Sequence, residues 1–161
     1  MKEELRQRGW RLGGNEPLKL TLLPKEYGYT GGELAAYLRK NNIYCEFFDD
    51  DDLVMMVSPE NGEEELSAAA RLLKELPRRQ EITVRPPAPG MPERVLTPHE
   101  TLMRPFESVP AEESLGRILA SPSVSCPPAV PILICGERID ERAMELFRYY
   151  GIKKCDVVRE S

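Results

Sequence analysis

The residue with the clearest chemical potential is Glu46, a carboxylate inside the apolar and aromatic segment "IYCEFF" at 43–48. Alternation along a strand would place Glu46 on one face together with Tyr44 and Phe48. A carboxylate between aromatic rings could bind a cationic ligand. It could equally be a rim residue with its head in water, because strand carboxylates are usually exposed. Glu46 is therefore the one candidate binding residue, and its segment is expected to be a β-strand.

Histidine and cysteine offer little for catalysis or metal binding. His99 is the only histidine, and it stands in "TPHE", where Thr97 and Glu100 form a capping box that predicts the start of a surface helix. None of the four cysteines belongs to a C-x-x-C pair, so a zinc site is not expected. We predict no catalytic residue and no metal site, and we interpret the cysteines as small apolar residues kept reduced. They are Cys45, Cys126, Cys135 and Cys155.

Two further patterns are better explained by structure than by chemistry. The run from Asp49 to Asp52 could attract Ca²⁺ or Mg²⁺, but a calcium loop spaces its ligands and has a glycine at its bend. A solvated β-turn is the favoured interpretation. The Gly31-Gly32 pair forms neither G-x-G-x-x-G nor a phosphate-binding loop, so no nucleotide site is expected. The lysines, Lys25 among them, stand in charged or loop stretches, and none is expected in an apolar pocket.

The composition indicates a globular chain without nucleic acid or membrane partners. It has 161 residues, of which 41% are hydrophobic and 30% charged, and a formal net charge of −5. Basic residues are scattered rather than arranged in the dense stripe that phosphate backbones require. No apolar run approaches the roughly 20 residues of a membrane helix. The first residues lack the apolar core of a secretion signal, so a cytoplasmic location is expected.

Residues up to 84 show the pattern of a small α/β unit. A capping box of Thr30 and Glu33 predicts one helix, and Asn61 is expected to cap a second that Pro77 ends. The order of elements is strand, helix, strand, strand, helix, which predicts a small open β-sheet with helices on one face. The predicted strands are 18–23, 43–48 and 53–57.

Proline marks a second unit, because 11 of the 15 prolines lie between Pro86 and Pro131. "RPPAPGMP" at 85–92 is interpreted as a stiff linker, so the expected domains are 1–84 and 85–161. Both belong to an α+β fold, the second being a small proline-rich subdomain. Helices are expected to begin at Pro98 and Pro110, and Asp140 is expected to cap a third helix over residues 141–150. The expected strands are 132–135 and 155–159. Pro127, Pro128 and Pro131 are expected to hold the chain extended before strand 132–135.

The proline-rich stretch resembles a family signature. "PPAVPILICGERI" is similar to P-P-G-[IV]-P-[IVL]-x-x-P-G-E-x-[IL] of the C-terminal domain of the bacterial ornithine/lysine/arginine decarboxylase family. "TPHETLMRPFESVPAEESLGRILASPSV" resembles the preceding pattern of that domain. Residues 19–76 are similar to the small subdomain before it, with "YTGGEL" opening a helix and "NNIYCEFF" matching a GI-x-x-E strand. The sequence departs from the family pattern at Ala129, Cys135 and His99.

The resemblance implies much about the intact enzyme. The family has an aminotransferase-like fold and depends on pyridoxal phosphate, which is bound to a lysine in a Ser-x-His-Lys motif of a large domain. No such motif occurs here, so the resemblance implies a C-terminal fragment with no cofactor-binding residue and with no activity of its own. Its implied partners are the missing large domain and a basic amino acid substrate, whose amine product belongs to polyamine metabolism. A homodimer is expected on other grounds, because the predicted strands 18–23, 43–48 and 53–57 carry large apolar side chains on both faces. Glu46 would face the distal cation of that substrate.

Two alternatives remain open at this point. The chain could be a free-standing binding or regulatory module that retains the decarboxylase C-terminal fold. It could also be a purely structural oligomerisation piece. These residues do not indicate whether the substrate of the intact enzyme is ornithine, lysine or arginine.

Overall fold

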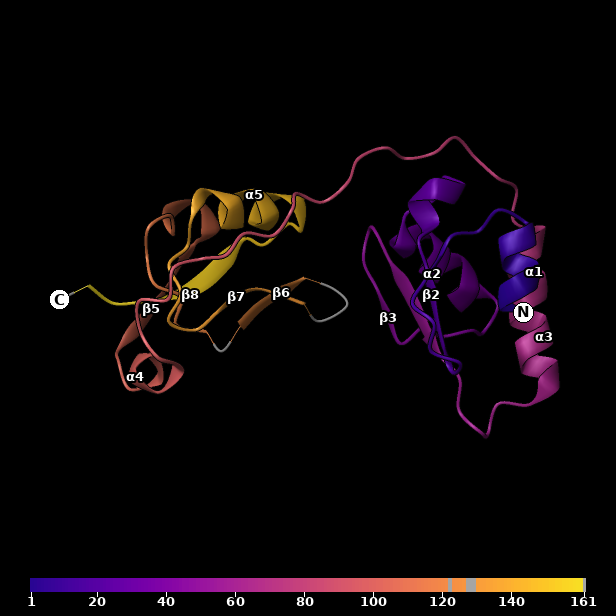
Figure 1. Cartoon of the computed structure of the whole chain (residues 1–161), viewed down its shortest axis with the longest axis horizontal. Helices are drawn as coiled ribbons and strands as arrows, with labels where there is room; N and C mark the ends of the chain where they lie inside the picture. The colour runs from indigo at the N-terminus through magenta and orange to yellow at the C-terminus, as the bar shows by residue number, and fades with distance from the viewer. Residues whose placement is uncertain (122, 127–129, 161) are drawn as a thin grey trace. The chain divides into compact units, whose positions relative to one another are not determined.

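The computed structural model describes residues 1–121, 123–126 and 130–160. The chain divides into two compact units, Met1–Arg85 and Pro86–Ser161, and Figure 1 shows the course of each. Residues 86–92, at the start of the second unit, form neither helix nor strand. Both units combine helices with small antiparallel sheets, which confirms the predicted α+β class.

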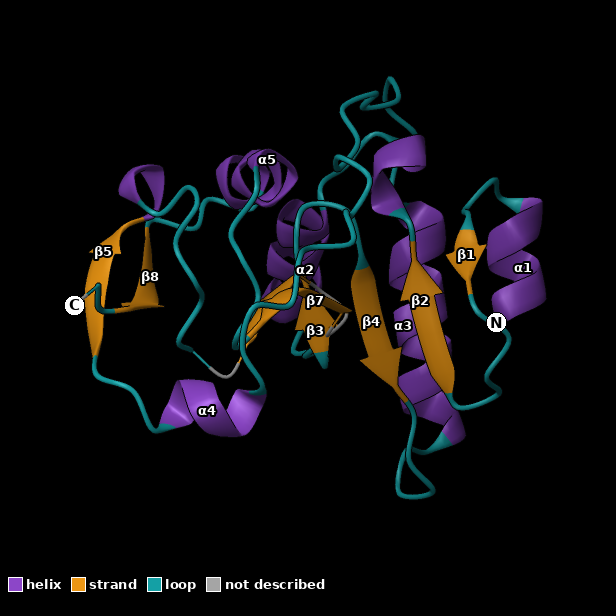
Figure 2. Ribbon diagram, turned by 60° about the vertical axis from the view of Figure 1, so that its left-hand side comes forward, coloured by secondary structure: helices purple, strands orange, loops and turns teal. Residues whose placement is uncertain are grey.

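The first unit contains a four-stranded antiparallel sheet of order β1-β2-β4-β3, visible in Figure 2. Its strands are β1 (Leu12–Gly13), β2 (Lys19–Leu22), β3 (Phe47–Phe48) and β4 (Leu53–Met56). Leu22 pairs with both Leu12 and Leu53, so these side chains share one face. That face contacts α1 (Lys2–Gln7), α2 (Gly31–Lys40) and α3 (Glu63–Glu75), which contribute Leu5, Leu34, Leu38 and Leu73 to the same core.

An aromatic stack completes this core at the end of α3. Trp10 and Tyr27 stack with ring centroids 3.9 Å apart, and Tyr29 follows with its centroid 6.4 Å from that of Tyr27. Trp10 Nε1 donates to the carbonyl of Leu73, and Tyr29 Oη donates to the carbonyl of Pro77 at 2.7 Å. Because the last carbonyls of a helix have no partner within it, Trp10 satisfies one of these at the C-terminal end of α3, whereas Tyr29 binds the carbonyl of Pro77, which lies just beyond the helix.

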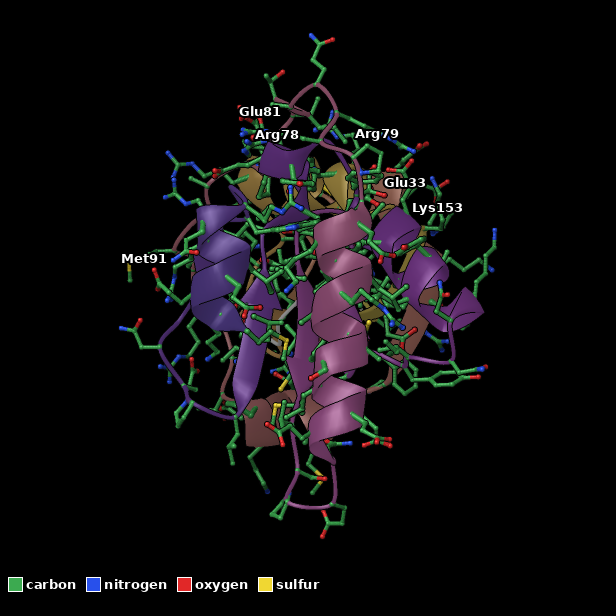
Figure 3. All side chains as sticks on the ribbon, turned by 90° about the vertical axis from the view of Figure 1, so that its right-hand side faces the viewer. Glu33, Arg78, Arg79, Glu81, Met91 and Lys153 are labelled. Carbon is green, nitrogen blue, oxygen red and sulfur yellow. The ribbon has the colours of Figure 1, made fainter. Side chains whose placement is uncertain are left out.

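The segment that follows α3 packs back onto the short 3₁₀ helix η1 (Pro24–Tyr27). Arg79 donates its backbone N–H to Tyr27, its guanidinium lies 4.1 Å from the Tyr29 ring centroid, and it forms an ion pair with Glu33 at 3.4 Å. Figure 3 labels Arg79 and Glu33. Gly28 has φ +94°, and a Cβ there would meet the backbone of Arg79. The close approach of these two segments therefore requires a glycine at position 28.

Two predictions for the first unit need correction. The strand expected at 43–48 is confined to Phe47–Phe48, because Ile43 still donates its N–H to Leu38 of α2 and cannot join the sheet. The cap of α3 is Gly62 rather than Asn61, since the Asn61 side chain instead accepts the N–H of Ser58. The elements α1, β1 and η1 were not predicted. The capping box of Thr30 and Glu33 is confirmed.

The second unit has two separate two-stranded antiparallel sheets. In one, β5 (Phe106–Pro110) pairs with β8 (Lys154–Val158), and in the other, β6 (Ser123–Cys126) pairs with β7 (Val130–Ile134). The helices are α4 (Pro98–Leu102) and α5 (Glu141–Tyr149), with a 3₁₀ turn η2 (Ala111–Glu113). The core is formed by Leu119, Leu133, Ile139, Phe147 and Val157.

The caps predicted for this unit are confirmed, and one helix is not. Thr97 caps α4 through the Glu100 N–H, and Asp140 caps α5 through the Ala143 N–H. The helix expected from Pro110 is only the single turn η2, because the Ser114 hydroxyl bonds back to Ala111 and Gly116 then adopts φ +80°. This left-handed residue ends helical geometry.

The strand expected at 132–135 forms but is displaced toward the N-terminus. β7 comprises Val130–Ile134 and includes Pro131, which pairs with Ser125 next to an irregularity in the register. A proline is tolerated in such a position because the ladder is already interrupted there. Pro127 and Pro128 lie outside the described residues. The strand expected at 155–159 is β8, shifted by one residue.

Candidate functional site

The candidate site is the outer face of the segment that contains Glu46. Tyr44 is 74% exposed, Phe48 is 40% exposed, and Glu46 between them is exposed. The alternating residues Ile43 and Cys45 pack against the core of the first unit. The side chains of the segment therefore alternate between core and solvent as the sequence pattern indicated, although its first half is not a strand.

The position of Glu46 is fixed by its backbone. Its N–H donates to the carbonyl of Val54 in β4 at 3.0 Å, which continues the β3–β4 pairing by one irregular contact. Its carboxylate forms no hydrogen bond or ion pair with any residue that the structure describes. An exposed carboxylate of this kind, with Tyr44 and Phe48 two positions away along the chain, can receive a cation from outside the unit.

A tight acidic turn follows β3 directly. Asp49 Oδ1 accepts the N–H groups of Asp51 and Asp52 at 2.9 and 2.6 Å, and Gly31 at the start of α2 donates its N–H to the carbonyl of Asp50. The second oxygen of Asp49 is buried without a hydrogen-bond partner among the described residues. The turn is thus packed against the first residue of α2, so only Asp50 fits the expectation of a solvated turn.

Lys25 is a buried lysine that binds the acidic turn through Asp51. This lysine is only 6% exposed, and its Nζ lies 2.8 Å from Asp51 Oδ1 and 3.1 Å from the carbonyl of Val84. It thereby connects three segments: η1, the acidic turn and the end of the first unit. The sequence pattern placed Lys25 in a charged or loop stretch and did not predict its burial, for which the ion pair with Asp51 compensates.

Burial also changes the acidity of this turn. It raises the pKa of Asp52 to about 6, with the charges of Asp49 and Asp51 acting in the same direction and that of Lys25 in the opposite one. Burial likewise raises the pKa of Asp49, against the two N–H groups that its carboxylate accepts. The turn therefore carries less negative charge near pH 5 than a solvated turn of the same sequence.

Replacing Asp52 with asparagine is expected to stabilise the first unit at pH 7 by about 1–2 kcal/mol. The folded-state pKa is about 6, above the unfolded value of about 3.9, so the folded protein holds an extra proton between these values. The contribution of Asp52 to the free energy of unfolding of the wild type therefore decreases as the pH rises through this window. The asparagine variant does not show this decrease.

Urea unfolding at pH 7 and pH 4 measures the effect. The gain should be present at pH 7 and should disappear at about pH 4. The exposed neighbour Asp50 provides the control, because Asp50→Asn removes the same charge without removing a buried carboxylate. An equal gain at both pH values would contradict the assignment to Asp52.

A hollow of about 320 Å³ borders the exposed aromatic face. Tyr44 lies on its rim, and Met55 and Met56 of β4 and Leu66 and Ala69 of α3 contribute apolar walls. Methionine side chains adapt to irregular shapes, so this hollow can accept an apolar group from a partner surface. Glu46 itself does not line this hollow.

The residues considered for other chemistry are distributed over both units. His99 is exposed in the first turn of α4, in the second unit. Cys45 faces the core and burial raises the pKa of its thiol, while Cys135 and Cys155 are buried in the second unit. The side chain of Cys126 lies outside the described residues. Within the described ranges, no group of three histidine, cysteine or acidic side chains could hold a metal ion.

Known proteins resemble both units. Residues 80–155 match the family model described as the Orn/Lys/Arg decarboxylase C-terminal domain. An arginine decarboxylase of Halalkalibacterium halodurans is 31% identical over 140 residues, a match that covers 83% of this chain. The chain belongs to the Orn/Lys/Arg decarboxylase family and corresponds to its C-terminal region. An arginine decarboxylase of Bacillus subtilis is 29% identical over 133 residues and 78% of this chain.

The family relatives are much longer than this chain. It spans 28% of the H. halodurans decarboxylase and 27% of the B. subtilis decarboxylase. The fold is also similar to that of the constitutive lysine decarboxylase of E. coli, with a TM-score of 0.65 at 17% identity, covering 89% of this chain and 32% of that one. The lysine decarboxylase of Francisella novicida gives the same TM-score at 16% identity and covers 92% of this chain and 32% of that one. In the described part of this family member, no helix is long and apolar enough to cross a membrane.

Local sequence patterns did not predict the Lys25–Asp51 ion pair that holds the acidic turn. The two residues are 26 positions apart, and nothing local connects them. One signal was present, because a run of four aspartates that packs against a protein needs a nearby cation. Lys25 stands between Pro24 and the aromatic Tyr27, which is an unusual setting for a solvated lysine.

Proposed function

We propose that this chain forms one wall of the active site of a decarboxylase that acts on a basic amino acid, with the rest of the enzyme supplying the cofactor. The observation that carries the proposal is Glu46, an exposed carboxylate without a partner among the described residues, with exposed aromatic residues two positions before and after it in the sequence. Family membership supports it, because the relatives are named for arginine and lysine decarboxylation. Both substrates carry a cation at the far end of the side chain.

The residues of this chain would bind and orient the substrate rather than react with it. Glu46 would pair with the distal ammonium or guanidinium group, and a charge leaving water requires such a partner. Tyr44 and Phe48 would cover the aliphatic part of the substrate and exclude water, which strengthens the ion pair. The hollow beside Tyr44 would accept an apolar side chain from the remaining part of the enzyme.

Pyridoxal phosphate, when bound, supplies the electron sink for decarboxylation. The residues described here do not fit a site for it. Lys25 is the one buried lysine among them, and its Nζ is already engaged by Asp51 and by the carbonyl of Val84. The sequence also lacks a Ser-x-His-Lys motif. We therefore assign the cofactor to the large domain of the intact enzyme, and no step of the reaction to a lysine of this chain.

In this proposal residues 1–84 are the small aminotransferase-like subdomain, and residues 85–161 are the C-terminal domain of the family. The enzyme would act in the cytoplasm and release an amine for polyamine metabolism. The proposal is supported by the family match over residues 80–155 and by the fold likeness over most of the chain.

Replacing Glu46 with glutamine in the assembled enzyme is expected to raise KM for the basic amino acid by about tenfold or more, with a smaller change in kcat. The distal cation does not change during decarboxylation, so its contact should be equally strong in the ground state and the transition state. Steady-state kinetics measure both parameters. Asp50→Asn, which alters an exposed carboxylate four residues away, should leave both within about twofold. An unchanged kcat/KM in Glu46→Gln would mean that Glu46 is an exposed surface residue that does not bind the substrate.

We further propose that the apolar side chains around this face are covered by a partner, and that the chain without its large domain forms a homodimer. Leu18, Tyr44, Phe48 and Met56 are all at least 40% exposed in the first unit. Light scattering over a concentration series should show a mass that rises from monomer to dimer. A monomeric mass at the highest concentration, without binding of a dye for apolar surfaces, would contradict this expectation.

A further inference from the structure

Four arginines line one hollow of about 220 Å³ in the second unit. They come from four separate segments, so the fold rather than local sequence gathers them: Arg104 follows α4, Arg117 follows η2, Arg138 follows β7 and Arg159 follows β8. Like charges repel, so four guanidinium groups around one hollow require groups that offset their repulsion.

Two of the four arginines are held in position by carboxylates and carbonyls. Arg117 Nη2 lies 2.6 Å from Glu107 Oε1 and 3.0 Å from the carbonyl of Val158, and its side chain is only 18% exposed. Arg138 donates to Glu93 at 2.8 Å and to the carbonyl of Gly116 at 2.9 Å. Their guanidinium planes are therefore fixed, which is the preorganisation that a binding site requires.

The other two arginines have no such partners. Within the described residues, neither Arg104 nor Arg159 forms an ion pair. Glu160 also lines the hollow and contacts Arg117 Nε at 3.2 Å, yet its side chain is 80% exposed. An exposed ion pair of this kind contributes little, so another anion can displace Glu160.

The charges leave the hollow positive. Its four arginines are opposed by three carboxylates, those of Glu93, Glu107 and Glu160. One positive charge remains while Glu160 is in place, and two remain when it turns into solvent. Guanidinium groups stay charged at all working pH values and match tetrahedral oxyanions through paired N–H donors.

We propose that this hollow binds a phosphate group, with Glu160 as a displaceable internal anion and with Arg104 and Arg159 as the residues that gain a partner on binding. A phosphate dianion matches the two positive charges that remain in this count when Glu160 turns into solvent, although Arg104 and Arg159 also interact electrostatically with Glu100 and Glu107. The hollow of about 220 Å³ has room for it. The hollow is lined only by residues of the second unit, and the proposal does not depend on the proposed role of Glu46 in the first unit.

Titration of the ¹⁵N-labelled whole chain tests this proposal through the arginine Nε–Hε signals. The probes are inorganic phosphate and glycerol phosphate, and chloride and acetate at matched ionic strength are the comparison anions. Both phosphates should shift the arginine signals in a saturable manner, and acetate should bind about tenfold more weakly or worse. Tighter binding of the inorganic ion would identify a free phosphate site, whereas tighter binding of glycerol phosphate would identify a site for a phosphorylated metabolite.

Three variants separate this site from general charge effects. The double variant Arg104→Ala/Arg159→Ala should weaken phosphate binding about tenfold. Glu160→Gln should strengthen phosphate binding about threefold. The double variant Arg94→Ala/Arg142→Ala removes two exposed arginines of the same unit that lie outside the hollow, and should bind as the wild type does. Equal affinity for acetate and phosphate, equal losses in the two double variants, or weaker binding in Glu160→Gln would each overturn the proposal.

Discussion

Replacing Gly31 with alanine is expected to destabilise the first unit by about 3 kcal/mol or more, although alanine is the better helix former. Gly31 is the first residue of α2, and a Cβ there would overlap the carbonyl oxygens of Asp49 and Asp52. The acidic turn would have to move away from α2. Its movement would also pull Asp51 from Lys25, which would leave a buried charge without its partner.

Unfolding of this unit can be followed with one intrinsic probe. Trp10 is the only tryptophan and is 2% exposed in the core of the first unit. Its fluorescence should report a Tm lower by about 12 °C or more in Gly31→Ala.

The adjacent residue provides a matched control. The nearest atom to a Cβ at Gly32 is Thr30 Oγ1, at 3.9 Å, so alanine fits there without strain. Gly32→Ala should therefore be neutral or stabilising by up to about 1 kcal/mol. Similar Tm values for the two variants would mean that the acidic turn does not pack against α2.

These two glycines show how far local sequence rules reach in this chain. The capping boxes at Thr30 and Thr97 involve residues three apart, so the pattern alone predicts them correctly. The difference between Gly31 and Gly32 depends on a turn about twenty residues away, which no local rule detects. The same limit explains the 43–48 segment, whose strand is shortened by the contact between Ile43 and the end of α2.

The candidate site also combines features that local sequence predicts with features that it does not. The exposure of Glu46 beside Tyr44 and Phe48 follows from alternation in one short segment, which is a local property. The ion pair that holds the neighbouring acidic turn is not a local property, because Lys25 reaches Asp51 across 26 residues. The arginine hollow of the second unit is more distant still from sequence patterns, since Arg117 contacts groups from Glu107, Val158 and Glu160.

The largest functional effect is expected from separating this chain from the remainder of a decarboxylase. Alone, it should release no amine from arginine, lysine or ornithine, because the described residues include no free buried lysine that could hold the cofactor. Mixing it with pyridoxal phosphate and reducing with borohydride should label no single lysine stoichiometrically. A full-length relative treated in parallel should be labelled on one lysine and should release amine.

The central claim, that this chain is a wall which completes a decarboxylase, is tested most directly by complementation. The arginine decarboxylase of H. halodurans, shortened by the region that this chain matches, is mixed with the chain and pyridoxal phosphate, and release of amine from arginine, lysine and ornithine is measured. We predict no release by either part alone, release by the mixture, and a raised KM when the added chain carries Glu46→Gln. Release of amine by the chain alone, or failure of the two parts to associate in size-exclusion chromatography, would contradict the claim.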